Sequence, residues 1–238
     1  MTERRRERLR AELERDVKKE ARRQIAEGGV EGLSLSAAAR AVGVTPPALY
    51  RYFDGRKGLA FAVYEDATAE CVAVVADAVA REDLQDLGAC LYAATRAFFD
   101  YSIAHPAEFD LLMGSGYARL ASSVEAFDPV FVHELGQLYV SLFTELVRTG
   151  FEYPQSDELA SSLQLNLNAY RELMGATEDF PLGVVLTMIT CWRQIYGLTC
   201  MAVYGHMATV FDDFIALFNH MLDDLLAMLG LKRAPGQG

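Results

Sequence analysis

Apolar side chains recur three and four residues apart along most of the chain, whereas alternation of apolar and polar residues never extends beyond a few positions. The first spacing places apolar side chains on one face of a helix, and alternation would place them on one face of a strand. Helices are therefore predicted over about residues 8–27, 35–42, 45–53, 56–80, 84–104, 106–113, 129–149, 158–174, 182–204 and 209–229, with residues 114–128 as a loop or a weak helix. The pattern predicts an all-α protein.

Two short predicted helices meet at Gly43, where the chain needs a tight turn. Their inner faces consist of Leu35, Ala38, Ala39, Val42, Leu49 and Phe53. The second helix is expected to begin at Thr45, whose hydroxyl would cap free amides, with Pro46 at the first helical position. A helix, a glycine turn and a second helix is typical of a helix-turn-helix motif that presents the second helix to the DNA major groove.

The outward side chains of this motif suit contacts with DNA. Small or rigid residues at the start of the second helix would meet base edges: Thr45, Pro46 and Pro47. Donors further along would hold phosphates: Tyr50, Arg51, Tyr52 and Arg56, with Ser34 and Ser36 at the start of the preceding helix. A hairpin of helices inside an ordinary core shows similar spacing and remains the alternative.

Here the sequence resembles the DNA-binding domain of TetR-family transcriptional regulators. Their pattern Gly-Val-x-x-x-x-Leu-Tyr-x-x-Phe-x-x-Lys-x-x-Leu is matched by Gly43, Val44, Leu49, Tyr50, Phe53 and Leu59. Arg56 stands where the family has a phosphate-binding lysine, and Asp54 stands where a basic residue is common. The resemblance implies a three-helix DNA-binding domain at the amino end and a larger helical domain that binds small effectors and forms dimers.

Charge is divided unevenly along the chain, whose formal net charge is -11. Residues 1–57 hold 14 Lys and Arg against 9 Asp and Glu, whereas residues 58–238 hold 8 against 24. A basic end on an acidic remainder favours an oriented DNA reader. We therefore expect a helix-turn-helix domain over residues 1–57 and a helical effector-binding and dimerisation domain over residues 58–238.

A cluster of arginines precedes the first predicted helix and includes Arg4, Arg5 and Arg6. Such a basic arm would reach the DNA backbone or the minor groove. Glutamates alternate with these arginines, so a solvated, frayed terminus is an equal alternative.

The two carboxy-terminal helices are long and apolar, and they contain Gly183, Gly197 and Gly205. Small residues allow helices to approach closely, so these two helices are predicted to pair with their copies in a homodimer through a four-helix contact. A two-fold dimer would double the contacts with a palindromic operator. The alternative is that both helices only fill the core of one chain.

Aromatic and polar-tipped residues of the middle helices are candidates for lining a ligand cavity. Such cavities are usually apolar with a few polar groups. They are Tyr92, Thr95, Phe99, Phe109, Met113, Trp192 and Tyr196. Each is also explained by ordinary core packing. The family resemblance implies a small-molecule effector that releases the protein from DNA.

Other function classes find little support. Four well-separated cysteines contain no Cys-x-x-Cys pair, which favours buried thiols in a reducing cytoplasm over a zinc site. The weakly charged run 182–211 contains Arg193, so we expect no membrane span. His220 near Asp223 and Asp224 is a weak catalytic or metal-binding signal, and no cofactor motif or enzyme motif is present. We expect a cytoplasmic transcriptional regulator, most simply a repressor; the alternative is a helical ligand-binding or protein-interaction module without specific DNA binding.

Overall fold

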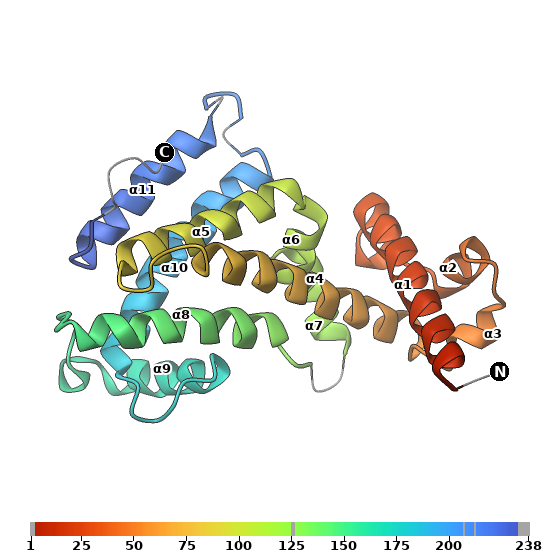
Figure 1. Ribbon diagram of the computed structural model, residues 1–238, viewed down its shortest axis with the longest axis horizontal. Coiled ribbons are helices and arrows are strands. Elements are labelled where there is room, and N and C mark those ends of the chain that lie inside the picture. The colour runs from red at the N-terminus through yellow and green to blue at the C-terminus, as the bar shows by residue number, and fades with distance from the viewer. Residues whose placement is uncertain (1–2, 125–126, 207, 212, 233–238) are drawn as a thin grey trace. The chain divides into compact units, whose positions relative to one another are not determined.

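The computed structural model describes residues 3–124, 127–206, 208–211 and 213–232, and every regular element within them is helical (Figure 1). The elements are α1 (Glu3–Gly28), η1 (Val30–Gly32), α2 (Leu35–Ala41), α3 (Pro46–Leu49), α4 (Gly55–Val79), α5 (Leu87–Ala104), α6 (Pro106–Met113), α7 (Ser115–Ser123), α8 (Val130–Arg148), η2 (Ser156–Glu158), α9 (Ser161–Leu173), α10 (Leu182–Val203) and α11 (Phe214–Met228). The prediction of an all-α chain is confirmed.

The helices form two compact units. The amino-terminal unit consists of Met1–Ala69 and Ala107–Asp128, and the helical body consists of Glu70–Pro106 and Pro129–Gly238. The segment 107–128, which contains α7 and most of α6, therefore belongs to the same unit as the first three helices although it is distant from them in sequence. The expected functional boundary between residues 57 and 58 stays a prediction.

The amino-terminal unit is built around the apolar faces of α1 and α4. Val17 and Ala21 of α1 are fully buried, and so are Leu59 and Tyr64 of α4. Tyr64 belongs to an aromatic cluster with Phe61, Tyr117 and Phe127, whose ring centroids lie 5.3–6.2 Å apart. This cluster ties α7 and residue 127 to the middle of α4.

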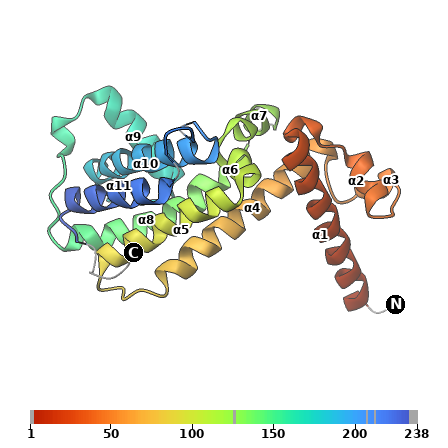
Figure 2. The ribbon, with the colours of Figure 1, turned by 90° about the horizontal axis from the view of Figure 1, so that it is seen from above.

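The helical body is centred on α10, which packs against α5, α9 and α11 (Figures 1 and 2). The rings of Phe99 and Phe218 stack with centroids 3.7 Å apart, joining α5 to α11. Phe98 and Trp192 join α5 to α10 at 5.4 Å.

Several helix ends differ from the predicted ones. The start of α1 is Glu3 instead of about Arg8, because arginine and glutamate are good helix formers and continue the helix past its apolar face. Asp86 caps α5 by accepting from the Ala89 amide, so that helix begins later than residue 84. Asp213 similarly caps α11, which begins at Phe214 instead of about 209. Residues 114–128, predicted as a loop or a weak helix, contain α7.

The glycines expected at a subunit contact have different roles. A Cβ on Gly183 would lie 1.8 Å from the carbonyl oxygen of Pro154, so this glycine permits a close approach within the chain. Gly205 has a φ of 65° after the end of α10, where it terminates the helix. A Cβ on Gly197 would meet nothing within 4 Å, which leaves this position open to a second copy.

Candidate nucleic-acid interface

A glycine turn joins α2 to α3, as the apolar spacing predicts. Ser34 caps α2 by accepting from the Ala37 amide at 3.2 Å, and Leu35, Ala38 and Ala39 are buried. Gly43 follows with a φ of 77°, a backbone conformation that residues other than glycine rarely adopt. The turn thus holds α3 at a defined orientation to α2.

The second helix of the motif is only one turn long. Tyr52 and Phe53 continue it as a turn by donating to the carbonyl of Leu49 at 2.9 and 3.0 Å. Gly55, with a φ of 63°, then starts α4. We call residues 45–53 the reader turn. The predicted hydroxyl cap is wrong, because the Thr45 side chain accepts no amide and only its backbone carbonyl does so, from Ala48 at 2.9 Å.

The reader turn has a buried face and an open face. Leu49 and Phe53 are buried, whereas the side chain of Tyr50 is 62% exposed and Arg51 is exposed. The remaining candidates for base edges also lie on the open side: Thr45 and Pro47 are exposed and Pro46 is half-buried. Burial of Leu49 and Phe53 therefore holds one short segment in place with five residues directed outward. Their contacts with DNA stay a prediction.

Tyr52 is held by a residue that the sequence does not link to it. The guanidinium of Arg10 lies 5.2 Å from the centroid of the Tyr52 ring, and its Nε donates to Glu14 at 2.8 Å. Cation–π contact of this kind stabilises a pair by about 0.5–1 kcal/mol at an exposed site. It fastens the reader turn to the amino half of α1.

Arg56 lies at the junction of three elements. Its Nη1 donates to the Glu31 carbonyl oxygen at 3.1 Å, and the Glu31 carboxylate pairs with Arg119 of α7 at 2.8 Å. Arg56 remains exposed, so its guanidinium can also donate to a phosphate. The Arg119 contact was missed from sequence because it joins residues 88 positions apart.

Gln24 is a second site residue that sequence reasoning missed. It is 9% exposed on the inner face of α1; its Oε1 accepts from the Ser34 amide at 2.8 Å and its Nε2 donates to Glu20 at 2.9 Å. Arg23 donates to both oxygens of Glu20, and these hydrogen bonds lower the pKa of Glu20 to about 2. Because Ser34 caps α2, this series of hydrogen bonds sets where α2 begins.

Replacing Gln24 with leucine is expected to lower the free energy of unfolding by about 1–3 kcal/mol, because the Ser34 amide would be left without a partner. Chemical denaturation monitored by circular dichroism measures the loss. Gln85→Leu, at an exposed loop position, is the matched control and should leave the midpoint unchanged. Equal midpoints for Gln24→Leu and the unmodified protein would show that this series of hydrogen bonds does not hold α2.

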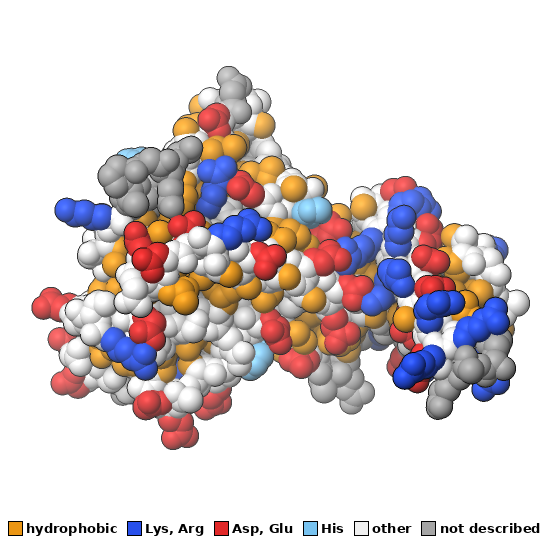
Figure 3. Space-filling view, in the orientation of Figure 1, with side chains coloured by type: hydrophobic (Ala, Val, Ile, Leu, Met, Phe, Trp, Pro, Cys, Tyr) orange, Lys and Arg blue, Asp and Glu red, His pale blue; other side chains and the backbone are white. Residues whose placement is uncertain are grey.

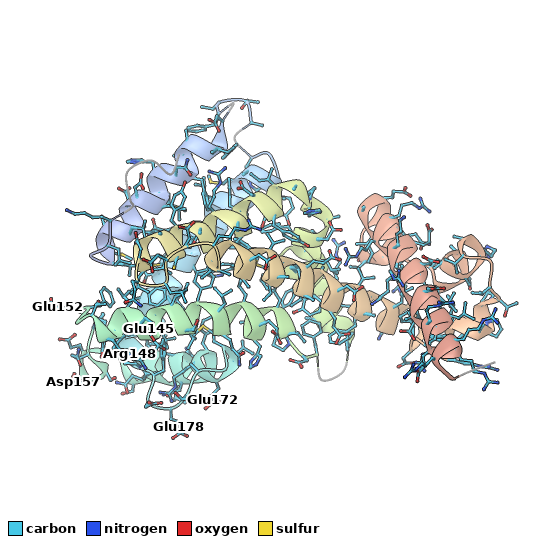
Figure 4. The ribbon with its side chains drawn as sticks, in the orientation of Figure 1. Glu145, Arg148, Glu152, Asp157, Glu172 and Glu178 are labelled. Atoms are coloured by element: carbon cyan, nitrogen blue, oxygen red, sulfur yellow. The ribbon has the colours of Figure 1, made fainter. Side chains whose placement is uncertain are left out.

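The proposed arm residues Arg4, Arg5 and Arg6 are exposed and form part of α1. The prediction of an arm ahead of the first helix is therefore wrong in conformation. Lysine and arginine side chains gather over the helices of the amino-terminal unit in Figure 3. In the helical body, acidic residues predominate around the labelled α8–α9 region of Figure 4, where Arg148 stands among Glu145, Glu152, Asp157, Glu172 and Glu178.

The structure separates the candidate ligand residues. Tyr92 donates to Asn219 of α11 at 3.0 Å, and Phe99 faces Phe218 of the same helix. Thr95 lies 3.2 Å from the hydroxyl of Tyr139 on α8, so these three residues of α5 do not share one direction. Trp192 and Tyr196 stack on α10, whereas Phe109 and Met113 fall in the amino-terminal unit. Their role in ligand binding stays a prediction.

Two family models match the chain. The one described as "Bacterial regulatory proteins, tetR family" matches residues 19–63, which include the whole helix-turn-helix motif. The one described as "Tetracyclin repressor-like, C-terminal domain" matches residues 91–225, more than half of the chain. The chain belongs to the TetR family. It is a transcriptional regulator with a helix-turn-helix DNA-binding domain, and regulators of this family are generally not enzymes.

Relatives and solved structures agree with this TetR-family assignment. The HTH-type transcriptional regulators Rv1816 of Mycobacterium tuberculosis and Mb1846 of Mycobacterium bovis are each 26% identical over 200 residues, covering 82% of both chains. The crystal structure of the regulatory protein SCO4313 matches with a TM-score of 0.66 and 23% identity over 93% of this chain and 98% of that one. A TetR family transcription regulator from Marinobacter aquaeolei VT8 matches with a TM-score of 0.55 and 19% identity over 91% and 97%. These structures share the fold.

Other candidate sites in this TetR-family chain are weaker. His220 Nε2 lies 3.9 Å from an Asp224 oxygen, and both side chains are more than 70% exposed. In the described residues, no three His, Cys, Asp or Glu side chains gather where they could hold a metal ion. The same residues contain no helix that is long and apolar enough to cross a membrane.

Proposed function

We propose that this chain is a repressor that binds a palindromic operator as a homodimer and is released by a small apolar or aromatic effector. The observation that carries the proposal is the reader turn, whose outward side chains are held by the buried Leu49 and Phe53 within residues 1–57, a stretch with 14 Lys and Arg against 9 Asp and Glu. In this proposal Thr45, Pro46 and Pro47 meet base edges in the major groove. Tyr50, Arg51, Tyr52 and Arg56 hold phosphates, and Ser34 and Ser36 add further phosphate contacts.

Arg56→Ala is expected to weaken binding to all DNA sequences alike, because a phosphate contact carries no base information. The slope of log affinity against log salt should become shallower by about one for each bound subunit. Fluorescence anisotropy with a selected duplex and a scrambled duplex measures both quantities. A change in the preference between the two duplexes would contradict the phosphate role of Arg56.

Dimerisation through α10 and α11 is supported by apolar surface left on both helices. Met201 of α10, Tyr204 at its end, and Ile215 and Met228 of α11 are 36–45% exposed. Four helices, two from each subunit, would remove these side chains from water. Sedimentation velocity tests the proposal. The double variant Met228→Glu and Ile215→Glu should be a monomer, and a variant that stays dimeric would show that the subunit contact lies elsewhere.

The effector site is proposed to lie around Thr95 and Tyr139 in the helical body. Burial raises the pKa of the Tyr139 phenol well above its usual range, and electrostatic interaction with Cys71 and Cys191 raises it further. Burial also raises the pKa of each of these two thiols to about 12. One hydroxyl pair in apolar surroundings suits an apolar molecule that carries a hydrogen-bonding group. Mass spectrometry of ligand retained by the purified protein, with Tyr139→Phe as the comparison, identifies the effector class.

A helical ligand-binding module without specific DNA binding is the rival proposal. Asp54 favours it, because this exposed carboxylate follows the reader turn and would repel phosphates. The repressor proposal places the protein in the cytoplasm with the chromosome; the rival requires no contact with DNA at any salt concentration.

A further inference from the structure

The amino-terminal turns of α1 extend past the helices that pack on it. We call residues 4–10 the helical arm. All of them are exposed, and the first fully buried residue of α1 is Val17. Figure 2 shows this half of α1 projecting beyond α2 and α3 within the amino-terminal unit. Core packing therefore does not explain why the helix continues to Glu3.

Positive charge without an acidic partner is concentrated at the tip of the helical arm. Arg8 pairs with Glu12 at 3.5 Å and Arg10 pairs with Glu14 at 2.8 Å, each one turn further along α1. Within the described part of the chain, Arg4, Arg5 and Arg6 have no such ion pair. The arm holds five arginines against one glutamate, Glu7, and the three adjacent arginines at its tip are the ones outside these ion pairs.

The charges of these three arginines oppose the helix that carries them, although arginine as a residue favours helix. The helix dipole is positive at its amino end, so each cation in the first turn costs about 0.3–1 kcal/mol. A polyanion that contacts the three side chains would offset this cost. The opposite charges and the exposure of the arm match a nucleic-acid backbone.

We propose that the helical arm lies against phosphates of duplex DNA just outside the base pairs that the reader turn contacts. This inference rests on the proposed DNA-binding function and adds the part of the duplex that the arm recognises. An α-helix with its side chains is about 10–12 Å across, whereas the minor groove is about 6 Å wide, so the arm contacts phosphates and does not enter that groove. The contact of Arg10 with the Tyr52 ring fixes the direction of the arm relative to the reader turn.

The test compares two duplexes that carry the site selected by the full-length protein from a random pool. One ends at the last base pair that the selection specifies, and the other is extended by about 10 base pairs, one helical turn, at each end. R4A/R5A/R6A is expected to lose about tenfold in affinity for the extended duplex and less than about twofold for the shorter one. Its salt slope on the extended duplex should fall by about two to three per subunit. Ethylation interference should map the lost contacts to flanking phosphates.

Two matched variants separate the arm from general charge effects. R4K/R5K/R6K keeps the positive charge and should keep the preference for the extended duplex. R81A/R148A removes two exposed arginines from the helical body outside α10 and α11 and should leave both affinities unchanged. Equal losses on the two duplexes, or an equal loss in the body variant, would overturn the arm inference while leaving the repressor proposal standing. Absence of binding by the unmodified protein to any duplex would overturn both.

Discussion

Gly183→Ala is expected to destabilise the helical body by about 3 kcal/mol, the upper part of the range for overpacked cores. The added Cβ would lie 1.8 Å from the Pro154 carbonyl oxygen and 3.0 Å from the Tyr153 ring. A backbone carbonyl cannot rotate away as a flexible side chain does, so α10 or the 150–158 connection must move. Thermal unfolding should show a fall in Tm of about 6–12 °C for a chain of this size.

Gly197→Ala is the matched control, because it lies on the same helix with no atom within 4 Å of the added Cβ. Alanine in a helix interior is favoured over glycine by about 1 kcal/mol, so this variant should melt at or slightly above the temperature of the unmodified protein. Equal Tm values for Gly183→Ala and Gly197→Ala would contradict the close approach of α10 to Pro154. Weaker dimerisation of Gly197→Ala would place that glycine in the subunit contact.

Arg51→Glu is expected to lower affinity for the selected duplex by about 100-fold or more. The substitution replaces an exposed guanidinium on the reader turn with a carboxylate, so an attractive phosphate contact becomes a repulsive one. A homodimer carries the change twice on one operator, which doubles its effect on the binding free energy. Folding should be unaffected, because Leu49 and Phe53 still anchor the turn.

Arg81→Glu makes the same change of charge at an exposed position of the helical body and serves as the control. Anisotropy titrations at one salt concentration compare the two variants, and circular dichroism verifies that both fold. A loss shared equally by Arg51→Glu and Arg81→Glu would mean that net charge alone governs affinity. An Arg51→Glu protein that binds as tightly as the unmodified one would remove Arg51 from the interface.

Local patterns in the sequence predict the helices because the relevant contacts lie within one or two turns. Ala38 and Ala39 are buried as their spacing requires, and Gly43 has the positive φ that a tight turn between two helices needs. Capping was harder to predict. Thr45 has a suitable side chain, yet no amide reaches its hydroxyl, whereas Asp86 and Asp213 cap helices that the periodicity alone extended too far.

The supports of the candidate interface could not be predicted, because they join residues that only the fold brings together. Arg119 reaches Glu31 from α7, and Arg10 reaches Tyr52 across the amino-terminal unit. Gln24 gives one local signal, a polar residue on an otherwise apolar stripe, but its partner Ser34 depends on the path of η1. The outward residues of the reader turn could be predicted from the sequence, because they occupy the helix face opposite to the buried Leu49 and Phe53.

The most direct test of DNA recognition by the reader turn is the affinity of the full-length protein for its selected palindromic duplex, measured by anisotropy between about 50 and 200 mM salt. We expect two chains per duplex, a clear preference over a scrambled duplex at each salt concentration, and affinity that falls steeply as salt rises. Equal affinity for the two duplexes, or no binding at the lowest salt concentration, would contradict it.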